Sequence, residues 1–498
     1  MRLSPLRTLA AVLALSVPAG LILAQETAPV PAPDAPPVEE PAVPLDGPAP
    51  VPAPDQAPGQ APEEEPAPSG EEPEPTAEEN AAAPRDPLEI YADLNLFGEI
   101  FDRIRSEYVD PPDEQELIRA AIQGMLTSLD PHSGYIAPQE YEEFSEDTSG
   151  EFGGLGIEVT MEEGVVKVVS PIDDTPAAEA GILANDLIIE IDGTQVQGLT
   201  LDDAVAKMRG PLGTSVKITV FREGVEAPLD FELTRAVIAM RAVRWSMEGG
   251  AEEGEGDVAL IRLSRFSEQA FVGIEQAIED IYEERDGVAP QGIILDLRNN
   301  PGGLVDQSVY VADAFLKQGA VVLTRGRLPQ ESARYDAKPD ELDALIADVP
   351  MVVLINGGSA SASEIVAGAL QDHKRATLVG TRSFGKGSVQ SIISLGPDGA
   401  MRLTTARYYT PDNRSIQALG ITPDIEIKQV VPEEFQGRDE IIGEAGLAGH
   451  ITIEGQEENS VGSSVYVPPE KADDAQLQYA IDLVQGEETN EAFPPQAE

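Results

Sequence analysis

Ser361 and Lys386 are the two residues of this sequence whose types and surroundings are best suited to chemistry. Ser361 follows an apolar run, Val349–Ile355, which predicts a buried strand, and a glycine-rich turn, Asn356–Gly358. Apolar residues then recur at helical spacing, so a helix is predicted to begin beside the serine. The first N–H groups of a helix lack internal partners and can donate to a developing oxyanion, so this arrangement suits a nucleophile.

The serine also fits a purely structural role. Ser361 followed by Glu364 matches a capping box, and a serine at a helix start is commonly only a cap. The segment Ser383–Gln390 favours chemistry, because it places Lys386 between two glycines, next to an aromatic residue and just before a β-type run. A lysine in a desolvated pocket can lose its proton and act as a base.

Composition limits the other mechanisms. The chain has no cysteine, which excludes a thiol nucleophile and a disulfide framework. Its three histidines, His132, His373 and His450, form no metal-spaced cluster, so no metal and no cofactor are expected. A Ser-His-Asp triad would have to use one of them, and His373 is interpreted as a surface residue at a helix end. Serine plus lysine is therefore the economical hypothesis.

The SASAS and FGKG motifs resemble those of the carboxyl-terminal processing proteases, also called tail-specific proteases, which are serine–lysine peptidases with an inserted PDZ domain. The resemblance runs from about Leu94 to Ile425. It implies that Ser361 is the nucleophile, that Lys386 is the general base and that Gln390 orients the lysine. It also implies a multidomain α/β fold whose core is crotonase- or Clp-like and built from ββα units.

The protease core is assigned to residues 237–430. Within it, a buried strand over Gly292–Arg298 precedes Asn299–Gly303, which reads as a turn into a helix. The turn resembles the family motif DLRxNPGG, which implies that the amide of Gly302 or Gly303 forms an oxyanion hole with the amide of Ala362. An ordinary lysine pKa of about 10.4 lies roughly 3 units above neutrality, so roughly 4 kcal/mol must come from the surroundings of the base. We therefore expect a closed, apolar pocket around Lys386.

Residues 150–236 have the element order of a protease-associated PDZ domain. The resemblance implies that a loop holds a substrate C-terminal carboxylate, and the groove beside it would add the peptide as a strand. The loop residues are Gly154, Leu155, Gly156 and Ile157. As a bare pattern these residues are only a glycine turn before a strand. Arg209, at the end of the predicted helix Leu201–Met208, is a candidate for gating; its structural alternative is a helix-terminal cation before a glycine.

The N-terminal 149 residues divide into three parts. Residues 1–24 are predicted to be a signal peptide, with an uncleaved N-terminal anchor as the alternative. Residues 25–86 are rich in Pro, Ala and Glu and are predicted to be a disordered tether. Residues 87–149 are predicted to be helical, and their motif Leu129–Ser133 resembles the LDPHS motif of the family.

Residues 431–498 form an acidic C-terminal region in which we identify no chemistry, apart from a short helix predicted near Ala475–Val484. The formal net charge of −56 argues against nucleic acid as a partner. The leading hypothesis is an exported, periplasmic serine endopeptidase that cleaves proteins with apolar C-termini. The family resemblance also implies a homo-oligomer and admits a helical-repeat lipoprotein adaptor. The alternative from another class is a PDZ-bearing binding protein on a degenerate protease scaffold.

Overall fold

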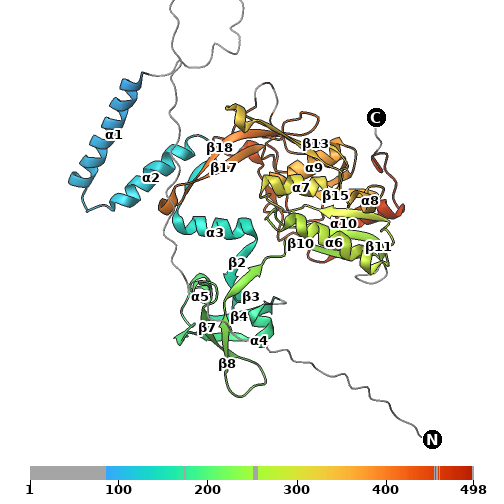
Figure 1. Cartoon of the computed structure of the whole chain (residues 1–498), viewed down its shortest axis with the longest axis horizontal. Helices are drawn as coiled ribbons and strands as arrows, with labels where there is room; N and C mark the ends of the chain where they lie inside the picture. Colours follow the sequence, from blue (N-terminus) through green and yellow to red (C-terminus); the bar gives the residue numbers. More distant parts are fainter. Residues whose placement is uncertain are drawn as a thin grey trace, which may run out of the picture. The chain divides into compact units, whose positions relative to one another are not determined.

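The computed structural model describes residues 86–162, 164–172, 175–250, 256–453, 455, 458 and 460–495 (Figure 1). The predicted signal peptide and almost all of the predicted tether lie outside these residues. In the described part, no helix has the length and apolar character needed to cross a membrane.

The segment before the PDZ domain contains α1 (Pro87–Glu107), α2 (Glu114–Thr127), β1 (Gly134–Ile136) and α3 (Pro138–Ser149). The Asp113 carboxylate caps α2 by accepting from the backbone N–H groups of Gln115 and Glu116. No residue of α1 is buried. The strand β1 was not expected, and it pairs with a strand of the protease core. The region is therefore built into the core at β1 rather than being wholly helical.

The PDZ domain has its own sheet and its own buried cluster. Its sheet runs β3-β4-β5-β7-β8, with β6 paired to β5, and a separate ribbon pairs β2 with β9. The elements are β2 (Glu151–Gly154), β3 (Ile157–Glu162), β4 (Val165–Pro171), α4 (Pro176–Ala180), β5 (Leu187–Ile191), β6 (Thr194–Gln195), α5 (Leu201–Met208), β7 (Ser215–Phe221), β8 (Leu229–Thr234) and β9 (Ala236–Ala239).

A six-stranded sheet forms the centre of the protease core, in the order β10-β11-β12-β15-β16-β19. From β11 to β19 the neighbouring strands are parallel, and the helices that connect them cover one face. The elements are β10 (Val243–Gly249), β11 (Gly256–Leu263), α6 (Ala270–Glu284), β12 (Gly292–Asp296), α7 (Val305–Asp313), β15 (Met351–Ile355), α9 (Ala362–Asp372), β16 (Thr377–Gly380) and β19 (Ile425–Glu426).

The C-terminal region covers the other face of this sheet. Side chains alternate between the two faces of a strand, so Ile294 and Val352 point away from the connecting helices. They pack with Leu477 and Ile481 of α10 (Ala475–Gln485) in a separate buried cluster. The remaining short elements are α8 (Asp343–Ile346), β20 (Glu440–Ile441), β21 (Ser463–Ser464) and 3-10 turns at Pro329–Glu331, Gly396–Asp398, Glu444–Gly446 and Lys471–Asp473.

A second sheet lies beside the end of β15. It runs β1-β18-β13-β14, and β17 also pairs with β18; the two lie side by side in Figure 1. Its strands are β13 (Gly319–Gly326), β14 (Ala333–Ala337), β17 (Ser388–Ser394) and β18 (Ala400–Tyr409). Because β15 leads to Ser361 and β17 begins just after Lys386, the two predicted catalytic residues meet where the sheets adjoin.

Candidate active site

Ser361 lies between β15 and α9 in an unusual backbone conformation. Its φ of 56° and ψ of −113° fall outside the regions that a residue with a Cβ readily adopts. Such strain persists only where the surroundings fix it, and it is concentrated at functional sites. Gly302 helps to fix it, since a Cβ at Gly302 would lie 2.8 Å from Ser361 Cβ. A side chain at position 302 would therefore collide with Ser361, so the serine packs directly against the backbone of the glycine turn.

Lys386 and Ser361 line the same cavity, which has a volume of about 420 Å³. Burial lowers the pKa of Lys386, and the cation of Arg402 lowers it further. The carboxylates of Glu444, Glu364 and Asp130 act in the opposite direction. The surroundings of the lysine therefore combine burial in a cavity with partly apolar walls and several charged groups.

Glu364 is hydrogen-bonded to both the Ser361 segment and the Lys386 loop. Its side chain is fully buried and accepts the backbone N–H of Ser361 at 2.7 Å and that of Lys386 at 2.9 Å. It also accepts the Gly385 N–H at 2.7 Å and the Ser383 hydroxyl at 2.6 Å. Burial raises the pKa of Glu364 to about 7, although these four hydrogen bonds act to lower it. One carboxyl group thus holds the serine and the lysine loop in register.

Gln390 lines the cavity with Lys386. Its amide Nε2 donates to Ser388 Oγ at 2.9 Å and to Thr404 Oγ1 at 3.3 Å. In the described part of the chain, no hydrogen bond joins Gln390 to Lys386, and none within 3.5 Å joins Lys386 to the Ser361 hydroxyl. The three predicted residues thus share the cavity without being hydrogen-bonded to one another.

The two glycines predicted for the oxyanion hole differ in their bonding. The Gly302 N–H donates to Asn300 Oδ1 at 2.9 Å, so it is already engaged. No acceptor in the described residues takes the N–H of Gly303 or that of Ala362. The pair able to donate to a substrate oxygen is therefore Gly303 with Ala362.

Tyr408 completes the wall beside the serine. Burial raises the pKa of its hydroxyl well above the ordinary value, and the nearby Ser361 side chain acts against that rise. Phe266, Leu304 and Ile392 supply apolar surface to the same cavity, whereas Arg265 and Asp147 supply charge. The cavity can hold a neutral, extended peptide segment next to the serine.

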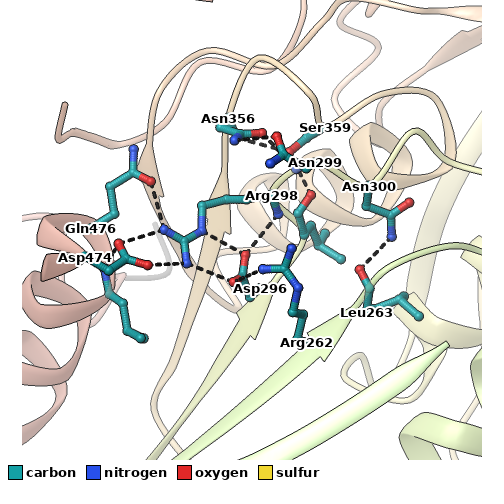
Figure 2. A network of polar contacts seen from close by, with 12 residues as sticks. Arg262, Leu263, Asp296, Arg298, Asn299, Asn300, Asn356, Ser359, Asp474 and Gln476 are labelled. Carbon is teal, nitrogen blue, oxygen red and sulfur yellow. Dashed lines mark hydrogen bonds and ion pairs between the residues drawn. The ribbon is translucent and has the colours of Figure 1, made fainter. Parts of the chain in front are cut away.

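Arg298 follows β12, and both its backbone N–H and its side chain donate to Asp296, the last residue of that strand. Arg298 is the centre of a buried ionic network (Figure 2). Its guanidinium is 2% exposed and binds Asp296 at 2.9 Å and Asp474 at 2.8 Å. Arg262 pairs with the same Asp296, and Gln476 accepts from Arg298 at 3.0 Å. This network connects the DLR motif to the start of α10, close to the asparagines of the glycine turn.

The predicted carboxylate loop connects β2 to β3: Gly154 is the last residue of β2, Ile157 is the first residue of β3, and Leu155 and Gly156 lie between them. Gly156 has φ +76°, and a Cβ there would lie 2.2 Å from the Thr175 side chain, so only glycine fits. The carbonyls of Leu155 and Gly156 accept from Ala177 and Ile172, which fixes the loop between Gly154 and Ile157. Arg209 is the C-cap of α5, and its Nη1 lies 2.6 Å from Glu146 Oε2 of α3.

Three family models match the chain. Peptidase family S41 matches residues 257–427, and the PDZ domain matches residues 153–233. The model described as the activating protease CtpB N-terminal domain matches residues 62–139, so it begins inside the predicted tether. The carboxy-terminal-processing protease of Bartonella bacilliformis is 53% identical over 405 residues, which are 81% of this chain and 91% of that protein. The chain belongs to the carboxyl-terminal processing protease family.

Other members lie further away. The carboxyl-terminal-processing protease of Synechocystis is 38% identical over 331 residues, covering 66% of this chain and 75% of that protein. A solved photosystem II D1 C-terminal processing protease is 29% identical with a TM-score of 0.38, covering 70% of this chain and 96% of that one. This protease is therefore a serine-type peptidase with a PDZ domain, and the predicted α/β fold class is confirmed.

His373 lies outside the cavity of the protease. It caps the C-terminus of α9, and its Nε2 lies 2.7 Å from the Ala320 carbonyl oxygen. His373 thus lies at a helix end as expected, and its side chain is partly exposed, with the ring packed against β13. Among the described residues no cluster of carboxylates and histidines could hold a metal ion.

Sequence reasoning missed several site residues of this protease. Glu364 is predicted above only as the second residue of a capping box. Its spacing from Ser361 was the signal that could have indicated a contact with the serine. Tyr408 lies in β18, outside every motif described above. Glu444 and Asp474 come from the C-terminal region, where no motif indicated them, and both are almost fully buried.

Proposed function

We propose that this protease is an exported endopeptidase that cleaves proteins near their C-termini with a Ser361–Lys386 dyad. The observation that carries the proposal is the single buried carboxyl, Glu364, that binds the backbone of both residues at the edge of one cavity. The strained serine and the desolvated lysine support the same assignment.

In the proposed reaction, Ser361 Oγ attacks the scissile carbonyl while Lys386, in its neutral form, takes the hydroxyl proton. The negative charge that develops on the carbonyl oxygen is stabilised by the N–H groups of Gly303 and Ala362. Lys386 then returns the proton to the leaving amine, and water hydrolyses the acyl-enzyme by the same steps. Gln390 lines the same cavity, and we propose that it orients Lys386 once bound substrate brings the two side chains into contact.

The dyad is tested with an internally quenched peptide and purified variants. Ser361→Ala and Lys386→Ala should each reduce kcat by about 10³-fold or more, and the double variant should be no worse, because the pair acts as a unit. His373→Ala serves as the control and should retain cleavage. Substantial turnover by Lys386→Ala would contradict the dyad, and inactivation by His373→Ala with the fold intact would favour a triad.

The PDZ domain is proposed to recognise the substrate tail. The loop Gly154–Ile157 would bind the terminal carboxylate, and β3 would pair with the peptide. Leu155, Val205 and Met208 belong to or pack against the domain core beside this groove, which suits an apolar terminal side chain. The substrates are therefore proposed to be proteins with apolar C-termini.

Homo-oligomerisation is proposed to use α1. Leu94, Phe97 and Ile100 recur at helical spacing on this helix, and each is more than half exposed. An apolar stripe of this kind marks a protein interface, and a second copy of the same helix offers a matching stripe. Phe97→Asp should reduce the mass measured by light scattering, with Glu99→Gln as the control. An unchanged mass in Phe97→Asp would contradict the proposal.

Export is proposed from the signal-like residues 1–24, with the periplasm as the destination. The family likeness also admits delivery of substrates by a helical-repeat lipoprotein. Both proposals concern segments or partners outside the described residues. Fractionation of cells that express the whole chain, and capture of partners from the periplasmic fraction by Ser361→Ala, test the two separately.

A further inference from the structure

The turn Asp130–Ser133, which follows α2, carries a dense set of buried polar contacts. The Asp130 carboxylate accepts the backbone N–H groups of His132 and Ser133, each at 2.8 Å, and the Ser133 hydroxyl at 2.8 Å. Burial alone would raise the pKa of Asp130, but these hydrogen bonds bring it below the ordinary value. The Asp130 carboxyl at the centre of the turn is therefore ionised and bound by hydrogen bonds within the turn. Three other groups of the turn contact the protease core.

The first of these groups is the Ser133 hydroxyl. Its oxygen accepts the backbone N–H of Thr404 at 3.1 Å, which fixes this residue of β18. The Thr404 hydroxyl in turn accepts from Gln390 Nε2 at 3.3 Å. A link of two hydrogen bonds thus runs from the turn to the residue proposed to orient Lys386.

The second group is the backbone carbonyl of His132. It accepts from Arg402 Nε at 2.7 Å and so holds a cation of β18 at the wall of the catalytic cavity. Arg402 is the nearby charge that disfavours the protonated form of Lys386. The remaining charged groups that act on Lys386 are Glu444, Glu364 and Asp130, and all three favour its protonated form. Arg402 therefore offsets an otherwise acidic surrounding.

The third group is the His132 imidazole. Its Nε2 lies 2.8 Å from the fully buried carboxylate of Glu444. Gln417 donates from Nε2 to Glu444 at 3.0 Å and accepts the backbone N–H of Gly387 at 3.0 Å through Oε1. This link ends at the residue directly after Lys386. Three sets of contacts that begin in one turn thus end at Gln390, Arg402 and Gly387.

We propose that the turn Asp130–Ser133 is a positioning element of the general base, which holds Arg402, Gln390 and Gly387 around Lys386. The inference rests on the proposed Ser–Lys function and adds residues from outside the peptidase match of 257–427. A turn that only anchored the N-terminal helices would not need the buried carboxylate of Asp130, or an imidazole paired with the buried carboxylate of Glu444, because desolvation of a carboxylate is unfavourable unless its polar atoms are paired.

The test is the pH dependence of kcat/KM between about pH 6 and pH 10, measured with the quenched peptide. Arg402→Gln removes the cation, so the protonated lysine is favoured and the rising limb should move to higher pH by about half a unit or more. Activity should recover at the alkaline end. Arg402→Lys keeps the charge and should restore most of the wild-type profile. Arg334→Gln, at an exposed ion pair in β14, is the matched control.

The turn itself is tested with Ser133→Ala, which should lower kcat by about tenfold with KM nearly unchanged, since Thr404, one of the two residues that accept from Gln390, is no longer held by the turn. Ser128→Ala, an exposed serine on the other side of the motif, is its control. Because Arg402 is exposed, its variants should fold whatever happens to Ser133→Ala. A profile for Arg402→Gln that superimposes on the wild type, or that is reduced equally at every pH, would overturn the inference alone. Absence of Ser361-dependent cleavage in the wild type would overturn the proposed function and this inference with it.

Discussion

Glu364 is the residue on which the geometry of the site depends most directly. A carboxylate that accepts two backbone N–H groups from the lysine loop and one from the serine can satisfy all of them only if both loops keep their places. Its burial also makes it titratable near neutrality, since the pKa of Glu364 is raised from 4.5 to about 7. Because Glu364 is fully buried, its protonation affects the stability of the fold as well as the geometry of the site.

The sign of its effect on stability follows from that shift. The folded chain binds the Glu364 proton more tightly than the unfolded chain, so the stabilising contribution is complete below about pH 4.5 and is lost as pH rises through 7. Between pH 5 and pH 8 the protease should lose roughly 2 to 3 kcal/mol through this group. Urea unfolding of Glu364→Gln should lack that part of the pH dependence, whereas Glu341→Gln, at an exposed site, should keep it. Parallel curves for Glu364→Gln and wild type would contradict the assignment.

Ser361 and Lys386, which line one cavity, could be singled out from the sequence because each lies in a short motif with its own turn chemistry. Glu444 and Arg402 could not, since they reach the lysine only through contacts between segments far apart in the chain. The choice of Gly303 over Gly302 was also beyond sequence, because it depends on a hydrogen bond from Gly302 to the side chain of Asn300.

At the scale of elements, residue patterns located the core strands β12 and β15 and the helix α5 of the PDZ domain. The sequence pattern predicted the helix α10 but not where it packs, because its apolar face resembles that of any short surface helix. The structure shows that α10 covers a whole face of the central sheet and brings Asp474 to Arg298. The strand β1 was missed for a related reason: three residues carry no periodicity, and their pairing with β18 is a tertiary contact.

The connection between α10 and the DLR motif leads to a stability prediction. Asp474→Ala leaves the buried Arg298 with one carboxylate partner among the described residues, Asp296, which already pairs with Arg262, and it also removes the N-cap of α10. Loss of one partner from a buried ionic network should reduce the free energy of unfolding by about 3 kcal/mol or more. Thermal unfolding checks this, with the exposed neighbour Asp473→Ala as control. Equal melting temperatures for the two variants would contradict a structural role for the network.

At the scale of the whole molecule, α3 is the element that connects the PDZ domain to the catalytic cavity. Phe144, Asp147 and Thr148 line the cavity, while Glu146 of the same helix binds Arg209 of the PDZ domain. The Arg209 guanidinium also lies 4.9 Å from the centre of the Phe152 ring in β2, the strand that leads into the proposed carboxylate loop. If a substrate tail binds at that loop as proposed, we expect it to alter the contact that holds α3, and through α3 the cavity.

Binding can change activity only if the ligand favours one of two arrangements, so affinity and stimulation must be measured separately. A peptide with an apolar C-terminus and a free carboxylate should stimulate cleavage of an internal-site reporter, and its amidated form should not. Arg209→Ala should bind the peptide with unchanged affinity but lose the stimulation, and Glu146→Gln should behave alike, because the two side chains form one ion pair. Lys207→Ala, an exposed cation on the same helix, is the matched control and should respond as wild type does. Equal stimulation by free and amidated peptides would exclude the loop as a carboxylate sensor. Full stimulation in Arg209→Ala would exclude this ion pair as the connection, since the signal would then reach the cavity by another contact.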